Sequence, residues 1–176
     1  MRFEPACSDR RVSVDDANAA WAQFTRDLGA ALLRLDIEEF LILESTKGGY
    51  VQFAQESDRL YAEAMSLEYV MADETLATDT RLISALRTEM GELGWLLPES
   101  CPPELVPPEE RGIGSPNYSL EWLEPVAFDE AARCAVATLR RVFGAGAPDD
   151  LRYVAFANEP FPPPSFPELR IPRRAD

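Results

Sequence analysis

The sequence predicts an α+β fold in which helices pack on an antiparallel sheet, with the element order α-β-β-β-α-β-α-β. Three observations predict it. The chain opens with a long amphipathic helical pattern, three short alternating segments joined by tight turns follow, and two further helical patterns alternate with single strand-like segments. Short connections between successive strands favour antiparallel pairing, and an amphipathic helix buries its apolar stripe on a sheet.

The first helix is predicted from apolar residues that recur every three or four positions between residues 17 and 35. Charged residues such as Asp15, Arg26 and Asp27 lie off that stripe, as expected for a helix with one solvated face. The stripe consists of Ala17, Ala20, Trp21, Phe24, Leu28, Ala31, Leu32 and Leu35.

Three strands are predicted next, over residues 40–43, 50–55 and 60–66. Gly48 and Gly49 mark the first hairpin turn, because glycine accepts the positive φ that such turns require. Alternation gives the second and third strands two different faces. In the second strand, Val51 and Phe53 lie on one face and Tyr50, Gln52 and Ala54 on the other. In the third strand, Leu60, Ala62 and Ala64 lie on one face and Tyr61, Glu63 and Met65 on the other.

The second half of the chain adds two helices and two strands. A helix over residues 78–93 is predicted to end at Gly94, which takes the left-handed conformation of a C-cap. Trp95 then folds back on the helix as the hydrophobic contact of that cap. The remaining elements are a strand over 117–123, a helix over 126–143 and a last strand over 152–157.

Proline content sets the expected domain boundaries. We expect an N-terminal extension at 1–12 and one α+β domain at 13–158, interrupted by a proline-rich loop at 98–116. The proline-rich C-terminal tail at 159–176 is not expected to pack a core of its own.

Composition excludes several classes of function. The chain of 176 residues carries a net charge of −14 and contains no histidine, which excludes Ser-His-Asp triads, Cys-His dyads and imidazole metal ligands. The negative charge argues against nucleic acid and anionic membranes as partners, because both carry phosphates. The longest strongly apolar run, 40–43, is too short to span a bilayer, so we expect a cytoplasmic protein. No catalytic residue, metal ligand or cofactor is predicted.

Aromatic side chains near strand ends and loops are the most informative residues. Such rings can form a surface for peptide recognition, and Gln52 and Gln55 could serve the backbone of a partner strand. The alternative is that the rings complete the core of a small domain. The aromatic residues concerned are Tyr50, Tyr61, Trp95, Tyr118 and Trp122.

Several short motifs together resemble a known family. They are Tyr50-Val51-Gln52-Phe53-Ala54-Gln55, Ala62-Glu63-Ala64, Leu93-Gly94-Trp95, Asn117-Tyr118 and Trp122. This pattern resembles actinobacterial proteins related to YbjN and the type III secretion chaperones, grouped as peptide-binding chaperone domains, over residues 15–157. The resemblance implies a secretion-chaperone-like fold, cytoplasmic location, frequent dimerisation, no catalytic machinery and binding of extended partner segments.

The leading functional hypothesis is therefore a non-enzymatic chaperone-like or adaptor module that binds a peptide or partner protein on its sheet and helix surface. The expected partner is basic or amphipathic, and a homodimer is expected. Two alternatives stay open. One is a metal- or ligand-binding domain, or an enzyme, that uses the carboxylates of Glu44, Glu63 and Glu121. The other is a structural subunit whose only role is to oligomerise. The predicted partner-binding residues are Tyr50, Gln52, Phe53, Tyr61, Trp95, Asn117, Tyr118 and Trp122.

Overall fold

The computed structural model describes residues 14–66, 80–98 and 115–174. The expected N-terminal extension at 1–12 and most of the proline-rich loop at 98–116 lie outside the described residues. The predicted order of helices and strands is confirmed. The elements are α1 (Val14–Leu33), β1 (Glu39–Ser45), β2 (Tyr50–Gln55), β3 (Arg59–Ala64), α3 (Thr80–Glu92), β4 (Tyr118–Leu123), α4 (Phe128–Arg141), β5 (Leu151–Ala157) and the 3-10 turns η2 (Pro148–Asp150) and η3 (Pro167–Leu169).

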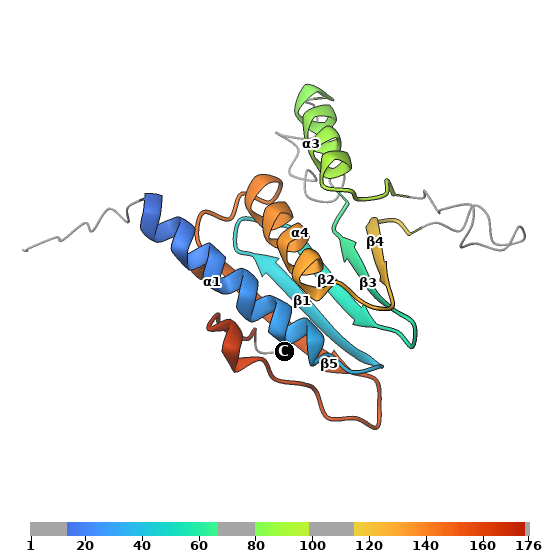
Figure 1. Ribbon diagram of the computed structural model, residues 1–176. Helices are drawn as coiled ribbons and strands as arrows, with labels where there is room; N and C mark the ends of the chain where they lie inside the picture. Colours follow the sequence, from blue (N-terminus) through green and yellow to red (C-terminus); the bar gives the residue numbers. More distant parts are fainter. Residues whose placement is uncertain (1–13, 67–79, 99–114, 175–176) are drawn as a thin grey trace, which may run out of the picture.

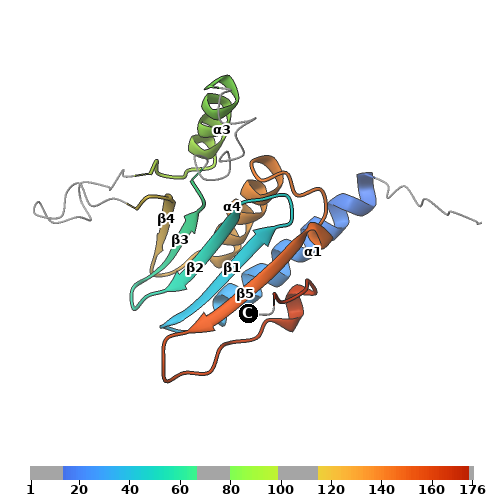
Figure 2. The same ribbon diagram turned by 180° about the vertical axis from the view of Figure 1, so that it is seen from behind.

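The five strands form one antiparallel sheet in the spatial order β4-β3-β2-β1-β5. Tight turns join β1 to β2 and β2 to β3, and β4, which follows α3 in the chain, adds to the sheet beyond β3. The last strand returns to the other side, where Leu41 of β1 pairs with Ala155 of β5. Figures 1 and 2 show α1 and α4 side by side on one face of this sheet, while no helix of the described residues lies on the other face. The predicted α+β layering is therefore confirmed, and it leaves one face of the sheet uncovered.

The core lies between the sheet and the two helices. Strand residues that face the helices are buried, while their neighbours are half-buried, which confirms the predicted alternation of β2 and β3. The helices supply the opposite wall with Trp21, Phe24 and Leu28 from α1 and Ala135 and Leu139 from α4. Gly29 lets the helices approach closely, because a Cβ there would lie 2.9 Å from Asp129 Oδ1.

A glycine cap ends α3 and brings Trp95 into the core. Gly94 has φ +91°, and the N–H of Trp95 bonds to the carbonyl of Met90 at 3.0 Å, as in a Schellman motif. The indole is 3% exposed, and its Nε1 donates to Thr138 Oγ1 of α4 at 2.8 Å. The predicted cap thus fixes the end of α3 to α4. Trp95 is a core residue, and its ring is not available to a partner.

The C-terminal tail packs on the domain. Phe166, Leu169 and Ile171 are buried in the same core as the helices and sheet. Arg34 of α1 holds this part of the tail, since it pairs with Glu168 at 2.8 Å and lies 5.7 Å from the centre of the Phe166 ring. The prolines that set this segment apart in the sequence do not prevent it from extending the core. Among the described residues, no helix is long and apolar enough to cross a bilayer.

Candidate functional site

The face of the sheet opposite α1 and α4, which we call the open face, carries no helix of the described residues (Figure 2). Strand register sets its composition, because paired residues point to the same side. Ile42 pairs with Gln52 and Val154, and Gln52 pairs with Glu63. In strand order, the open face comprises Phe40, Ile42, Glu44, Tyr50, Gln52, Ala54, Arg59, Tyr61, Glu63, Ser119, Glu121, Leu123, Arg152, Val154 and Phe156.

One half of the open face is apolar. The rings of Phe40 and Phe156 stack across β1 and β5, and Ile42 and Val154 form the next pair along the same strands. We call these four residues the apolar strip. Phe156 is 41% exposed, so part of the strip is available to another molecule.

The other half is a hydrogen-bonded cluster around the carboxylate of Glu63. Its Oε2 accepts from Gln52 Nε2 at 2.5 Å and from Asn117 Nδ2 at 3.4 Å. Its Oε1 accepts from the Tyr61 hydroxyl at 3.0 Å and from Ser115 Oγ. Asn117 Nδ2 also donates to the Tyr50 hydroxyl at 3.3 Å. We call these five residues and Tyr50 the Glu63 cluster. The cluster ties β2, β3 and the start of β4 into a fixed polar platform.

The electrostatics of the Glu63 cluster keep Tyr61 protonated. Burial raises the pKa of the Tyr61 phenol, and the negative charge of Glu63 raises it further. A phenol with a raised pKa remains a hydrogen-bond donor at neutral pH. Tyr61 therefore donates its hydroxyl hydrogen to the carboxylate of Glu63 and helps to orient it.

The predicted partner-binding residues divide into two groups. The structure brings Tyr50, Gln52, Tyr61 and Asn117 together in the Glu63 cluster. The remaining four lie on the helix side of the sheet or in the core, so their rings are not part of the open face. Phe53, Trp95 and Tyr118 are buried, and Trp122 packs against the core while partly buried.

Sequence reasoning did not single out the apolar strip. The sequence pattern predicts residues 40–43, which include Phe40 and Ile42, only as a buried apolar run, and Phe156 lies in the last strand. The signal was present in Arg152 to Ala157, where polar and apolar residues do not alternate cleanly. A strand of that kind has apolar side chains on both faces, which indicates an apolar surface outside the core.

The three carboxylates of the metal-site alternative do not converge. Glu44 binds Arg152 and Arg174, at 2.6 and 2.5 Å, and Glu121 binds Arg59 at 3.3 Å. Glu63 is surrounded by neutral donors. In the parts of the chain that the structure describes, no group of three His, Cys, Asp or Glu residues could hold a metal ion. Burial also raises the pKa of the Cys134 thiol to about 12, so this cysteine is not a thiolate nucleophile.

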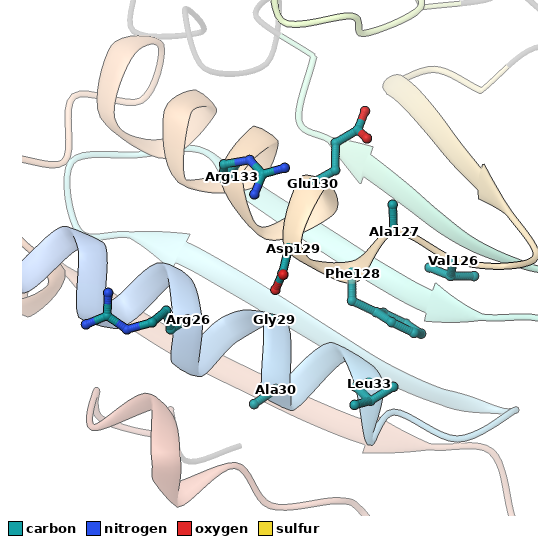
Figure 3. A pocket seen from close by; sticks show the side chains of 10 residues that line it. All are labelled: Arg26, Gly29, Ala30, Leu33, Val126, Ala127, Phe128, Asp129, Glu130 and Arg133. Atoms are coloured by element: carbon teal, nitrogen blue, oxygen red, sulfur yellow. The ribbon is translucent and has the colours of Figure 1, made fainter.

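The helix side carries several grooves, and two of them have leucine and phenylalanine side chains in their lining. The first, of about 520 Å³, separates α1 from α4; Figure 3 shows Leu33 and Phe128 at one end and Arg26 and Arg133 at the other. The second, of about 500 Å³, lies between the first turns of α1, η2 and the tail, with Phe24 and Leu169 in its lining. Both have mixed polar and apolar walls.

Comparison with family models connects this fold to known proteins. Residues 14–157 match TY-Chap3, described as T3SS (YopN, CesT) and YbjN peptide-binding chaperone 3. The chain belongs to the TY-Chap3 family. No curated protein and no solved structure gives a significant match. The family match ends at Ala157, so the TY-Chap3 region includes the whole open face and excludes the C-terminal tail.

Proposed function

We propose that this TY-Chap3 protein is a non-enzymatic, chaperone-like module that holds an extended segment of a partner protein on the open face of its sheet. The observation that carries the proposal is the combination of the apolar strip and the Glu63 cluster side by side on a face that α1, α3 and α4 leave uncovered. A partner segment in extended conformation has alternating side chains. Its apolar side chains fit the strip, and its polar ones fit the cluster.

The composition of the open face favours a basic or amphipathic partner segment. Glu44 and Glu121 are already paired with arginines, so the preference for basic segments rests on the carboxylate of Glu63, which only neutral groups contact, and on the chain's net charge of −14. Charge of one sign raises the association rate of segments of the opposite sign and disfavours acidic ones. The exposed part of the Phe156 ring provides an aromatic anchor, the type of residue that most often dominates binding energy.

Preorganisation supports the proposal. The hydrogen bonds within the Glu63 cluster fix the side chains of Gln52, Tyr61 and Asn117 before a partner arrives. Side chains that are already ordered lose less entropy on binding, which leaves more of the interaction energy as affinity. The expected homodimer and the cytoplasmic location remain predictions, and light scattering after size exclusion tests the dimer.

The experiment is a peptide array probed with the full chain. It presents 12-residue peptides in which basic, apolar and acidic residues are varied systematically. The test variant is Phe156→Glu, which places a charge in the apolar strip. The matched control is Leu33→Glu, the same class of change at a leucine that is 66% exposed in the groove between α1 and α4.

The proposal predicts that the unchanged chain binds peptides that combine basic and apolar residues, and that Phe156→Glu lowers this binding about tenfold or more. Leu33→Glu is expected to bind as the unchanged chain does. Circular dichroism shows whether both variants fold. Loss of binding in Leu33→Glu alone would assign the site to the helix groove and would refute the open face.

A further inference from the structure

The outer edge of β5 is occupied by the chain's own C-terminal segment. The N–H of Tyr153 donates to the carbonyl of Pro172 at 3.0 Å, and the N–H of Arg174 donates to the carbonyl of Tyr153 at 2.8 Å. Tyr153 and Arg173 form a parallel bridge. Residues 172–174 therefore add a short strand to the sheet, in the mode by which peptides add to exposed sheet edges. We call residues 172–174 the latch.

Two arginines fasten the latch at its sides. Arg174 Nη1 lies 2.5 Å from Glu44 Oε1 on the open face, and Arg173 Nη2 donates to the carbonyl of Ala155 at 2.8 Å. Glu44 is held from its other oxygen by Arg152 at 2.6 Å. A carboxylate positioned between two arginines at a sheet edge selects an arginine from whatever segment pairs with β5.

The latch is weakly held compared with the segment before it. All three of its residues are exposed, and among the described residues it is attached only by two backbone hydrogen bonds, the Arg173 contact and the pair of Arg174 with Glu44, whose side chain is 15% exposed. By contrast, Phe166, Leu169 and Ile171 are buried and keep the tail on the domain. The latch can therefore open without unfolding the core, and it recloses at high effective concentration.

The edge is longer than the latch. Alternate residues of an edge strand direct their backbone groups outward, so those of Ala155 and Ala157 point the same way as those of Tyr153. Among the described residues, none bonds to the backbone of Ala157 or to the N–H of Ala155 across this edge. A longer segment can thus gain hydrogen bonds that the latch does not make. Its open-face side chains would lie beside Val154 and Phe156.

We infer that the outer edge of β5, with Glu44 beside it, accepts an extended, arginine-bearing segment of the partner by strand addition, and that the latch occupies this edge in cis until the segment displaces it. The inference rests on the proposed function and deepens it, because it places the partner's backbone on one edge of the open face. It also assigns the chain's own C-terminal arginine a regulatory role.

The test compares two charge reversals in the full chain. Arg174→Glu sets a carboxylate against Glu44 and opens the latch. The matched control, Arg170→Glu, makes the same change on an exposed residue of the same tail, before the buried Ile171 and away from the edge. Hydrogen exchange at the Tyr153 amide is the first readout, and it is expected to be faster in Arg174→Glu than in the other two chains.

Peptide binding is the second readout, with the same peptide array as probe. If the latch covers the edge about nine-tenths of the time, opening it tightens the binding of arginine-containing peptides about tenfold in Arg174→Glu. Arg170→Glu is expected to match the unchanged chain. The best peptide is then methylated on alternate backbone nitrogens. Because a strand pairs through alternate N–H groups, methylation of one set is expected to abolish binding and methylation of the other to preserve it.

The outcomes separate the two proposals. If no chain binds any peptide, the proposed function is wrong and this inference falls with it. If peptides bind all three chains equally but lose affinity with Phe156→Glu, the proposed function stands and the inference is overturned. Equal loss from both methylation patterns also overturns strand addition. Tighter binding to Arg174→Glu with one sensitive methylation pattern supports both.

Discussion

The rings of Phe40 and Phe156 stack with their centroids 4.7 Å apart and their planes at 10°, on the face of the sheet opposite the helices. A stacked aromatic pair that joins a central strand to an edge strand stabilises the sheet from its exposed side. It also leaves an apolar surface facing solvent, which in a monomer indicates an interaction site. The same pair therefore serves the sheet and the proposed partner.

The two faces of the sheet differ in what an aromatic ring contributes to stability. Phe53 is 1% exposed, so Phe53→Ala is expected to lower the free energy of unfolding by about 3–5 kcal/mol. Phe156→Ala removes a ring that is already partly hydrated and is expected to cost about 1 kcal/mol. Urea denaturation of both variants measures the difference. Equal losses would mean that the open face is covered in the free protein.

The hairpin between β1 and β2 depends on one glycine more than on its neighbour. Gly48 and Gly49 both have positive φ, but a Cβ at Gly49 would collide with the ring of Phe143, while nothing lies within 4 Å of one at Gly48. Gly48→Ala is expected to cost about 1 kcal/mol of backbone strain. Gly49→Ala adds a clash with a buried ring, so its loss should exceed that of Gly48→Ala by about 1–3 kcal/mol.

Thermal or urea denaturation of the two glycine variants provides the comparison. Each serves as the other's control, since both change the same residue type in the same turn. A Gly48→Ala chain that is less stable than Gly49→Ala would contradict the contact between this turn and Phe143.

The hydrogen bond from Trp95 to Thr138 joins the end of α3 to α4 in the core. Thr138→Val keeps the shape of the side chain but leaves the indole N–H without its acceptor, so we expect a loss of about 1–3 kcal/mol. Thr25→Val is the control, because Thr25 also bonds to a helix carbonyl four residues back but accepts no such indole. Its effect is expected to stay within about 0.5 kcal/mol. Similar losses in the two variants would contradict this role of Thr138.

Asp150 makes the stability of the fold depend on pH. The N–H of Gly146 donates to its Oδ2 at 2.7 Å and lowers the pKa of the carboxyl; the N–H of Ala147 and the charge of Lys47 add to the effect. A carboxyl whose pKa is lower in the folded state stabilises the fold above its unfolded pKa of about 3.9. That stabilisation disappears as the pH falls through the lower, folded pKa.

The variant Asp150→Asn isolates this contribution. The difference in free energy of unfolding between the two chains is expected to be largest above about pH 5 and to shrink below about pH 4. Denaturation curves at several pH values measure it. A difference that stays constant from pH 7 to pH 3 would show that the charge of Asp150 is not involved.

Local patterns predicted most of the fold because most of its elements are locally encoded. Alternation in β2 and β3, the glycine turn between β1 and β2, and the cap at Gly94 each depend on neighbouring residues. The pairing of β5 with β1 is different, because it joins residues more than a hundred positions apart. No local pattern specifies which of two free edges a last strand takes.

The candidate site was predicted only in part, for a similar reason. The alternation of β2 places Phe53 on the same face as Val51, opposite Tyr50 and Gln52. Phe53 is therefore assigned to the core by the sequence pattern itself, and not to the partner-binding surface. The burial of Trp95 and Tyr118 depends on how α3 and β4 meet α4, which the sequence does not show. In the tail, Phe166, Leu169 and Ile171 follow neither a helical nor a strand periodicity, so no local pattern indicates that they are buried together.

Photo-crosslinking of a bound peptide tests the open-face site at the level of single residues. A peptide selected on the array carries a photoreactive group at each position in turn, and mass spectrometry locates the linked residues in the unchanged chain. We expect links to open-face residues of β1, β2 and β5, such as Ile42, Gln52 and Phe156. Links confined to α1 and α4, around Leu33 and Phe128, would contradict the proposal.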